Sequence, residues 1–322
     1  ENLIWDYDRI VSQVLSREST RRTPSVRTLA QSYALDSLHR TITLAKRATR
    51  PWAKQLSTDI GARVERKILR KIGYFGADTA QTGDWVPSSS TTVFDYKRGT
   101  LAPYQPFEHQ GLGFNKVLDD EQRALYAPAI AYLTRAAPDV IARKIARANV
   151  QQAFVFDSVV RLAGPLATAK LLSVGSYEDT AAIALIRSGY DVEEVDPLLN
   201  YDLTTFTTKP SVRANSFDVV LSTSVIEHVQ NDDEFASGIA YLLKPGGVAV
   251  LTCDFRDGFR PGDPLPAADR RLYTVHDLER RLLDAMPDCQ LLDAPSWKGT
   301  RPDFEYEGTM YSFATFVVRK KS

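Results

Sequence analysis

Short apolar runs alternate with helical stretches beyond residue 168. The runs are nearly continuous, which is typical of strands that are buried on both faces. The predicted strands are 171–174, 192–195, 217–222, 248–253 and 313–318, and the predicted helices between them are 180–188, 232–243 and 275–283. Strands that alternate with helices in this way predict a parallel sheet with helices on both faces, so the expected fold class is α/β.

Residues 1–72 have a helical pattern, which is clearest between Pro51 and Gly73. Apolar side chains recur there every four residues and predict an amphipathic helix over 51–72, with Pro51 at its first position and Gly73 as its stop. These apolar positions are Trp52, Leu56, Ile60, Val64, Ile68 and Ile72. The opposite face is basic. We interpret it as the solvated face of a helical bundle, with contact to a membrane surface or an acidic partner as the alternative.

Turn formers and aromatic residues dominate residues 86–118. A long loop rich in aromatic residues is usually functional, so we interpret it as a lid or linker, with ordinary packing as the alternative. Its candidate substrate contacts are Tyr96, Tyr104 and His109. The expected domains are a helical N-terminal module at 1–85, this loop at 86–118, and a sheet domain with leading helices at 119–322, whose core begins at 168.

The net charge of zero is unevenly distributed along the chain. Residues 1–150 carry 23 Lys and Arg against 15 Asp and Glu, whereas residues 151–322 carry 17 against 25. The acidic second half disfavours nucleic acid as a partner. Cys253 and Cys289 are too few for a disulfide framework and lack metal-binding spacing, so we expect a reducing, cytoplasmic setting. No apolar run is long enough to cross a bilayer.

Two residues mark the ends of the first two predicted strands, where open α/β sheets bind ligands. Gly175 ends the first strand and Asp196 ends the second, at a separation typical of a ribose-binding carboxylate. Glu178 and Asp179 stand where the next helix begins, and their charges would repel the pyrophosphate of a dinucleotide. A cationic nucleoside without phosphate fits this site better.

Further motifs follow in a fixed order. They are Asp202-Leu203, FDVVLSTSVIEHV (217–229), LLKPGGVAVLTC (242–253) and LYTVHDLERRL (272–282). Together with Gly175 and Asp196, they make the chain resemble the class I S-adenosylmethionine-dependent methyltransferases over about residues 150–322. The resemblance implies a Rossmann-like sheet preceded by the helical module, and S-adenosyl-L-methionine as the cofactor.

The resemblance also implies which residues bind this cofactor. They are Gly175, Ser176 and Tyr177 in the turn beneath it, Asp196 and Pro197 at the ribose, Asp202 and Leu203 at the adenine, and Ser222 and Thr223 at the methionyl part. The chain departs from the family pattern at Ser173, where an acidic residue is usual, and at Tyr177 and Asp179, where glycines are usual. A non-catalytic adaptor with this fold therefore stays an alternative.

His228 is the best candidate for a general base, with Glu227 beside it. It follows the third predicted strand at the cofactor edge, and a histidine titrates near neutral pH. A structural role is its alternative, and His109 is the alternative base. Some relatives bind a divalent metal through an E-x-x-E-H pattern, but Ser224 replaces the first carboxylate here. A metal held by the remaining ligands, even with Asp254 added, is therefore not favoured.

The segments 254–271 and 295–309 occupy the places of the family's substrate loops. Asp254, Trp297 and Tyr306 combine carboxylate acceptors with flat apolar faces, which suits the hydroxyls and faces of a sugar. The sequence thus predicts an O-methyltransferase that acts on a saccharide, a glycan or another small hydroxylated metabolite. The alternatives are a nucleic-acid or protein methyltransferase, which would dock on the basic residues 40–72, and the non-catalytic adaptor.

Overall fold

The computed structural model describes residues 96–106, 113–163, 168–299 and 301–322. They belong to one compact unit, Phe94–Ser322. The predicted helix 51–72 and His109 lie outside the described residues, and so do most of the expected N-terminal module and part of the aromatic loop. Among the helices that the structure describes, none combines the length and the apolar character needed to span a membrane.

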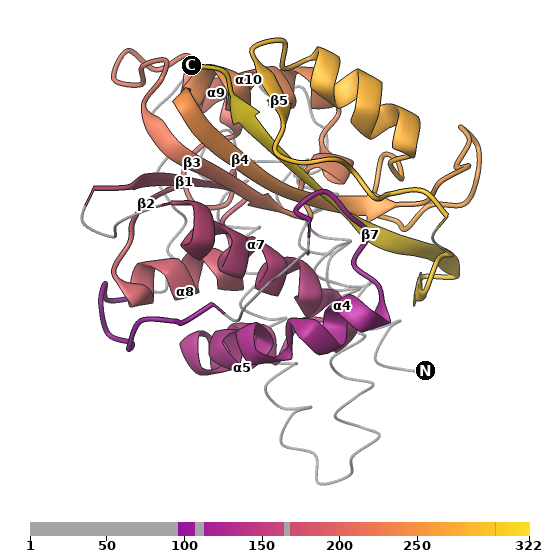
Figure 1. The fold of residues 1–322 in the computed structure, drawn as a ribbon, viewed down its shortest axis with the longest axis horizontal. Helices are drawn as coiled ribbons and strands as arrows, with labels where there is room; N and C mark the ends of the chain where they lie inside the picture. Colours follow the sequence, from indigo (N-terminus) through magenta and orange to yellow (C-terminus); the bar gives the residue numbers. More distant parts are fainter. Residues whose placement is uncertain (1–95, 107–112, 164–167, 300) are drawn as a thin grey trace, which may run out of the picture. The chain divides into compact units, whose positions relative to one another are not determined.

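The described strands form one seven-stranded sheet, in the order β2-β1-β3-β4-β7-β5, with β6 paired to β7 (Figure 1). The first four strands in this order are parallel to one another. The bounds are β1 Lys170–Val174, β2 Asp191–Val195, β3 Phe217–Thr223, β4 Leu243–Phe255, β5 Cys289–Leu291, β6 Phe304–Tyr306 and β7 Thr309–Lys320. The expected α/β sheet is confirmed.

The last strands differ from the wholly parallel sheet that the sequence predicts. β7 runs antiparallel to both β4 and β5. A parallel neighbour needs a crossover connection, usually through a helix. Residues 292–308 between β5 and β7 hold only β6, which pairs with β7 as a hairpin across Glu307 and Gly308. Both of these residues have a positive φ angle, 49° and 76°, and the hairpin returns the chain antiparallel.

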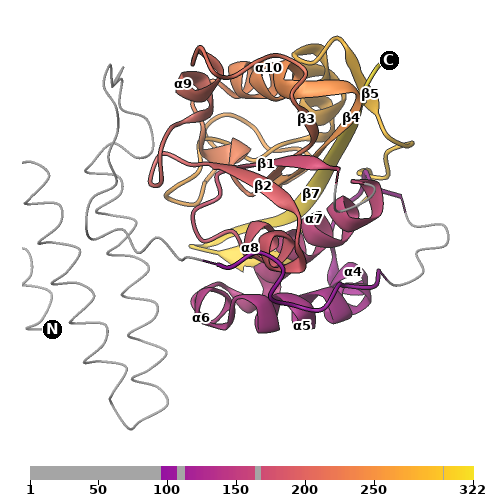
Figure 2. The same ribbon diagram turned by 90° about the vertical axis from the view of Figure 1, so that its left-hand side faces the viewer.

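Helices cover both faces of the sheet (Figure 2). On one face lie α4 Asp120–Leu125, α5 Ala127–Ala136, α6 Pro138–Ile141, α7 Asn149–Leu162 and α8 Thr180–Ser188, and on the other α9 Leu203–Thr207, α10 Asp232–Leu242 and the π-helix Asp277–Leu282. Short 3₁₀ turns occupy Ala146–Ala148 and Ile226–His228. Each face has its own buried apolar core, as expected for a sheet whose strands are apolar throughout.

The segment before α4 is fixed by the C-terminal strand. The side chain of Asn115 is fully buried and pairs with Val317 on both sides: its Nδ2 donates to the Val317 carbonyl at 3.0 Å, and its Oδ1 accepts from the Val317 amide at 2.7 Å. The predicted lid therefore ends as a strand-like segment against β7. Farther upstream, the amide of Leu101 donates to the carbonyl of Arg187 near the end of α8.

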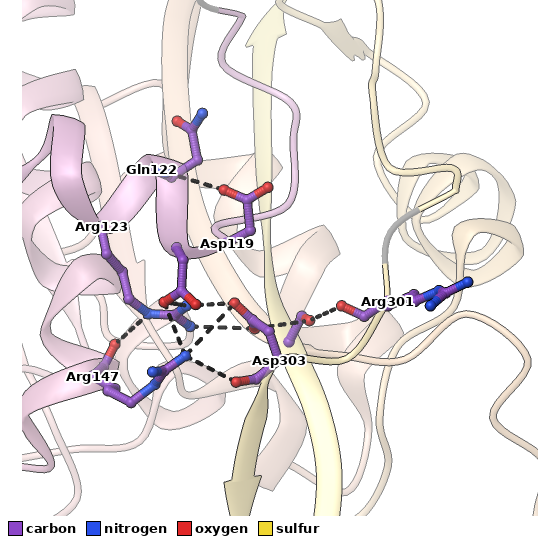
Figure 3. A network of polar contacts seen from close by, with 8 residues as sticks. Asp119, Gln122, Arg123, Arg147, Arg301 and Asp303 are labelled. Carbon is purple, nitrogen blue, oxygen red and sulfur yellow. Dashed lines mark hydrogen bonds and ion pairs between the residues drawn. The ribbon is translucent and has the colours of Figure 1, made fainter.

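An ion-pair network joins the helices to the hairpin of β6 and β7 (Figure 3). Arg123 of α4 binds the carboxylates of both Asp120 and Asp303, and Arg147 binds Asp120 at 2.9 Å and the carbonyl of Asp303 at 3.0 Å. The side chain of Arg123 is only 11% exposed, so this pairing is shielded from solvent more than a usual surface ion pair. The network holds the segment 301–306 against the helical layer.

Candidate functional site

The turn after β1 is built around Gly175. Its φ angle is +76°, in the left-handed region that favours glycine. A Cβ atom at this position would collide with the side chain of Val225, which follows β3. The glycine is therefore required both by its backbone conformation and by the close approach of the two loops. Ser176, the next residue, is buried, with 2% exposure.

Asp196 joins the end of β2 to this turn. Its Oδ2 accepts from the amide of Tyr177 at 3.0 Å, and its Oδ1 accepts from the amide of Leu198 at 2.8 Å. The residue is 1% exposed. A carboxylate at the end of the second strand is the kind of group that accepts hydrogen bonds from the two hydroxyls of a ribose. The predicted ribose residue, Asp196, thus contacts one residue of the predicted turn, Tyr177.

The two acidic residues at the start of α8 have separate structural roles. Asp179 is the N-cap and accepts from the amides of Ala181 and Ala182 at 2.7 and 3.1 Å. Glu178 forms an ion pair with Arg143 at 2.6 Å. Burial raises the pKa of Asp179. The favourable field at the helix N-terminus therefore does not fully offset the free-energy cost of removing this carboxylate from solvent.

Glu194 of β2 stands beside Ser173 of β1 in the register of the sheet. Burial raises the pKa of Glu194 to about 7, and the charges of Asp179 and Asp196 add to the effect. Ser173 is fully buried. The family pattern has a carboxylate at the position of Ser173. In this chain, Glu194 carries a carboxylate beside that position, on the neighbouring strand.

The loop after β3 brings Ser224 and Glu227 together. Ser224 has a positive φ of 56°, and its hydroxyl donates to Oε1 of Glu227 at 2.7 Å. The Glu227 side chain is fully buried, and its other oxygen, Oε2, has no hydrogen-bond partner in the part of the chain that the structure describes. Burial raises the pKa of Glu227, an effect that His228 opposes and Asp269 reinforces.

His228 is paired with Asp269, from the loop after β4. Its Nδ1 lies 3.1 Å from Oδ1 of Asp269 and 3.3 Å from the carbonyl of Ala268. The imidazole is 27% exposed, whereas the Asp269 side chain is 3% exposed. Burial lowers the pKa of His228, but the hydrogen bond to Asp269 and the charge of Glu227 outweigh it and raise the pKa above its ordinary value. Such a pair fixes the ring and increases its basicity.

Asp254 completes a group of three carboxyls at this edge. It lies near the end of β4 and is 5% exposed, and its Oδ1 has no hydrogen-bond partner in the described part of the chain. Burial raises its pKa well above the ordinary value, and the charges of Glu227 and Asp269 raise it further. No group of His, Cys, Asp and Glu among the described residues is arranged to hold a metal ion.

Gln151 of α7 adds a neutral acceptor to this group. Its Nε2 donates to Ser224 Oγ at 3.3 Å, which links it through Ser224 to Glu227. The residue is 2% exposed, and its Oε1 has no hydrogen-bond partner in the described ranges. Buried polar groups in proteins are rarely left without partners. Unmet acceptors of Gln151 and Glu227 therefore indicate a place for a ligand or water molecules that donate hydrogen bonds.

Other predicted cofactor residues lie at the same edge of the sheet or beside it. Ser222 donates to the carbonyl of Val174 at 3.0 Å, and Thr223 lies beside Asp179. Asp202 caps α9 by accepting from the amide of Thr205 at 2.7 Å. Leu203 lines a surface hollow of about 460 Å³ between α9 and α10. Neither Asp196 nor His228 lines this hollow, so it is separate from the cluster of the Glu227, Asp254 and Asp269 side chains.

The structure places two of the predicted substrate contacts in packed surroundings. Trp297 is 1% exposed; its Nε1 donates to the carbonyl of Thr315, and its ring stacks near Phe316. It therefore belongs to the core and offers no free face to a sugar. The hydroxyl of Tyr104 donates to Asp157 at 3.1 Å, and its ring packs on Tyr132 and Phe156. Packing accounts for this residue as well.

The remaining predicted contacts are divided between the site and its surroundings. Asp254 belongs to the cluster that it forms with Glu227 and Asp269. Tyr96 lies at the surface near Arg143 and Glu178, and Tyr306 of β6 stacks on Phe304. Asp269 is the main residue that sequence reasoning missed. It lies in an irregular loop, where no periodicity or motif marks it.

Comparisons with known proteins agree with this architecture. Residues 146–300 match the family model of a methyltransferase domain. No curated protein matches the chain significantly. Structural matches include a putative S-adenosylmethionine-dependent methyltransferase from Listeria monocytogenes, with 11% identity, 52% of this chain and 98% of that chain covered, and a TM-score of 0.36. TehB from Haemophilus influenzae has 19% identity, coverages of 51% and 62%, and a TM-score of 0.38.

A third match is a Burkholderia thailandensis 1,6-didemethyltoxoflavin N1-methyltransferase, whose structure contains its substrate and S-adenosylhomocysteine. The identity is 16%, the match covers 68% of this chain and 100% of that chain, and the TM-score is 0.40. Similarities this low carry no information about the substrate. The family match, the strand order and the contact of Tyr177 with Asp196 lead to one conclusion: residues 146–300 are a methyltransferase domain of the class I S-adenosylmethionine-dependent family.

Proposed function

We propose that this enzyme methylates a hydroxyl group of a saccharide, a glycan or another small hydroxylated molecule. The observation that supports this proposal best is the pair of His228, which is partly exposed, and the buried Asp269, 3.1 Å apart, beside the loop after β3. A hydroxyl acceptor must lose its proton during transfer, and a histidine held by a carboxylate is suited to take it. The unmet acceptors of Gln151 and Glu227 also favour a ligand rich in O–H donors.

The proposed cofactor site uses residues of three strand ends. Asp196 binds the ribose hydroxyls, the turn at Gly175 and Tyr177 lies beneath the cofactor, and Thr223 borders the methionyl part. The carboxylate of Asp196 accepts from the amides of Tyr177 and Leu198, which ties it to this turn and supports the assignment. When bound, S-adenosylmethionine supplies a methyl group activated by a positively charged sulfur. The residues of the chain then position the acceptor hydroxyl in line, which is where most of the rate enhancement arises.

His228 takes the hydroxyl proton in this proposal, and Asp269 stabilises the imidazolium that results. Glu227 is adjacent and adds a second negative group that favours the charged ring.

Cys253 and Cys289 are both buried and unpaired, which supports a reducing, cytoplasmic setting for the enzyme.

The test is a transfer assay with an isotopically labelled methyl donor and a panel of saccharides, glycans and small hydroxylated metabolites, read by mass spectrometry. We expect a mass increase of one methyl group on a hydroxyl of at least one compound, and its loss in His228→Ala. Methylation of nucleic acid or protein substrates alone would contradict the proposal. Absence of S-adenosylmethionine binding in calorimetry would favour the non-catalytic adaptor.

A further inference from the structure

The three carboxyls of Glu227, Asp254 and Asp269 are close together and poorly balanced by positive charge. The charges that act most strongly on Asp254 are those of Glu227 and Asp269, and no described lysine or arginine is among them. Arg271, in the same loop as Asp269, is paired instead with Asp232 at 3.2 Å. Glu227 Oε2 and Asp254 Oδ1 are buried and have no hydrogen-bond partner within the described residues. Buried acidic groups without counter-charge are costly, so a cation should bind here.

Gln151 gives an independent indication of a ligand at this place. It is neutral and belongs to α7, on a different element from the carboxyls, yet its buried Oε1 also lacks a partner in the described part of the chain. Its amide nitrogen contacts Ser224, which contacts Glu227. The unmet atoms of Gln151 and Glu227 are both acceptors, so the complementary group must carry several N–H or O–H donors.

The position of the cluster assigns it to the methyl acceptor rather than to the ribose. Asp196 ends β2, whereas Asp254 lies on β4, and the sheet order β2-β1-β3-β4 separates these strands by three intervals. Neighbouring strands are ~4.8 Å apart, so the separation is about 14 Å. A cofactor held by Asp196 would lie over β1 and β3, between Asp196 and Asp254, so Asp254 is on the side of the methyl acceptor.

We propose that the methyl acceptor carries an ammonium group beside the hydroxyl that is methylated, and that Glu227 and Asp254 bind this ammonium. An amino sugar is the simplest member of this chemical class. The three N–H donors of an ammonium match the unmet oxygens of Glu227, Asp254 and Gln151, and its positive charge is complementary to the carboxylates. This inference rests on the proposed function, because it names the substrate of the same site.

The first experiment compares matched acceptors. Glucosamine, galactosamine and mannosamine are each incubated with the enzyme and labelled methyl donor, next to their N-acetyl forms and the parent hexoses. We expect kcat/KM for at least one amino sugar to exceed that of its neutral counterparts roughly tenfold or more, the usual effect of a charge-assisted hydrogen bond. Equal or faster transfer to the neutral sugars would overturn the inference and leave the proposed function standing. Absence of transfer to every hydroxyl compound would overturn both.

The second experiment asks whether the carboxyls serve the cofactor instead. Asp254→Asn removes one charge, and Glu227→Gln is the second variant should the first fail to fold. We expect both to abolish the preference for the amino sugar while the Kd values for S-adenosylmethionine and S-adenosylhomocysteine change less than about twofold. Weaker binding of S-adenosylmethionine alone would show that the cluster neutralises the sulfonium, which overturns the inference. Asp288→Asn, an exposed carboxylate at the opposite edge of the sheet, is the matched control.

Discussion

The Nδ1 atom of His228 lies 3.1 Å from Oδ1 of Asp269, although the two residues are separated by the whole of α10 and β4. The carboxylate is buried more deeply than the imidazole. This arrangement orients the ring and raises its pKa. It also makes the pair testable, because the two residues should affect turnover in different ways.

His228→Ala should lower kcat at least ~100-fold, the usual range for the loss of a general base, with little change in cofactor affinity. Asp269→Asn should lower kcat less and move the acidic limb of the pH–rate profile to lower pH. The reason is that the histidine acts when neutral, and removal of the carboxylate lowers its pKa toward the ordinary value. An unaltered pH profile in Asp269→Asn would show that the pair does not take part in proton transfer.

Asp196→Ala should weaken binding of S-adenosylhomocysteine roughly tenfold or more, because it removes the charged acceptor for two hydroxyls and for the amide of Tyr177. Calorimetry measures the affinity. Glu193→Gln on the same strand is the control, since that residue is exposed. Equal affinities in the wild type and Asp196→Ala would mean that the ribose is held elsewhere.

Gly175→Ala should destabilise the fold more than Gly246→Ala does. Both glycines have similar positive φ angles, +76° and +78°, so each substitution costs about 1 kcal/mol for the backbone conformation. Only at Gly175 would the new methyl group collide with Val225, whereas nothing lies within 4 Å at Gly246. Overpacking adds about 1–3 kcal/mol. Urea unfolding gives both free energies, and a Val225→Ala background should remove most of the difference.

Glu194→Gln should stabilise the protein at pH 8 and have little effect at pH 4. The pKa of Glu194 is about 7 in the folded chain, above the ordinary value near 4.5, so the native state binds more protons than the unfolded state between these values. The free energy of unfolding of the wild type therefore falls as pH rises from 4.5 to 7. At pH 8, Glu194→Gln should increase the free energy of unfolding by about 2 kcal/mol. This is less than the full pKa shift would give, since Glu194 is partly exposed to solvent.

Urea unfolding at pH 4 and pH 8 measures this difference, with Glu193→Gln as a neighbour that faces the other side of β2. A gain of the same size at both pH values would indicate better packing by glutamine rather than relief of a buried charge.

Strand positions near the core were predictable because buried strands leave an apolar signature. The predicted 217–222 and 192–195 fall within β3 and β2, and helix 180–188 has the bounds of α8. Asp179, which caps that helix, and Gly189, which ends it in a left-handed conformation, are local signals that sequence reasoning can use. Asp196 was found for the same reason, since its position follows from strand and helix lengths.

The acceptor side of the site was predicted less well. Asp269 and Gln151 meet His228 and Ser224 only through tertiary packing, and no period or spacing in the sequence encodes that meeting. Trp297 illustrates the opposite error. An aromatic residue in a polar loop resembles a binding platform, yet it is buried because β7 and Asn115 enclose the segment that carries it.

Asn115 and Val317 are bound to each other across more than half of the described chain. β7, which carries Val317, is the last of the described strands to leave the ribosome, and it lies between β4 and β5 in the sheet. During synthesis, one edge of β4 therefore stays unpaired until β7 has been made. The side-chain amide of Asn115 lacks its contacts with Val317 until then. Folding of this domain should be completed only after β7 has left the ribosome, and aggregation during expression should depend on how fast this strand is inserted into the sheet.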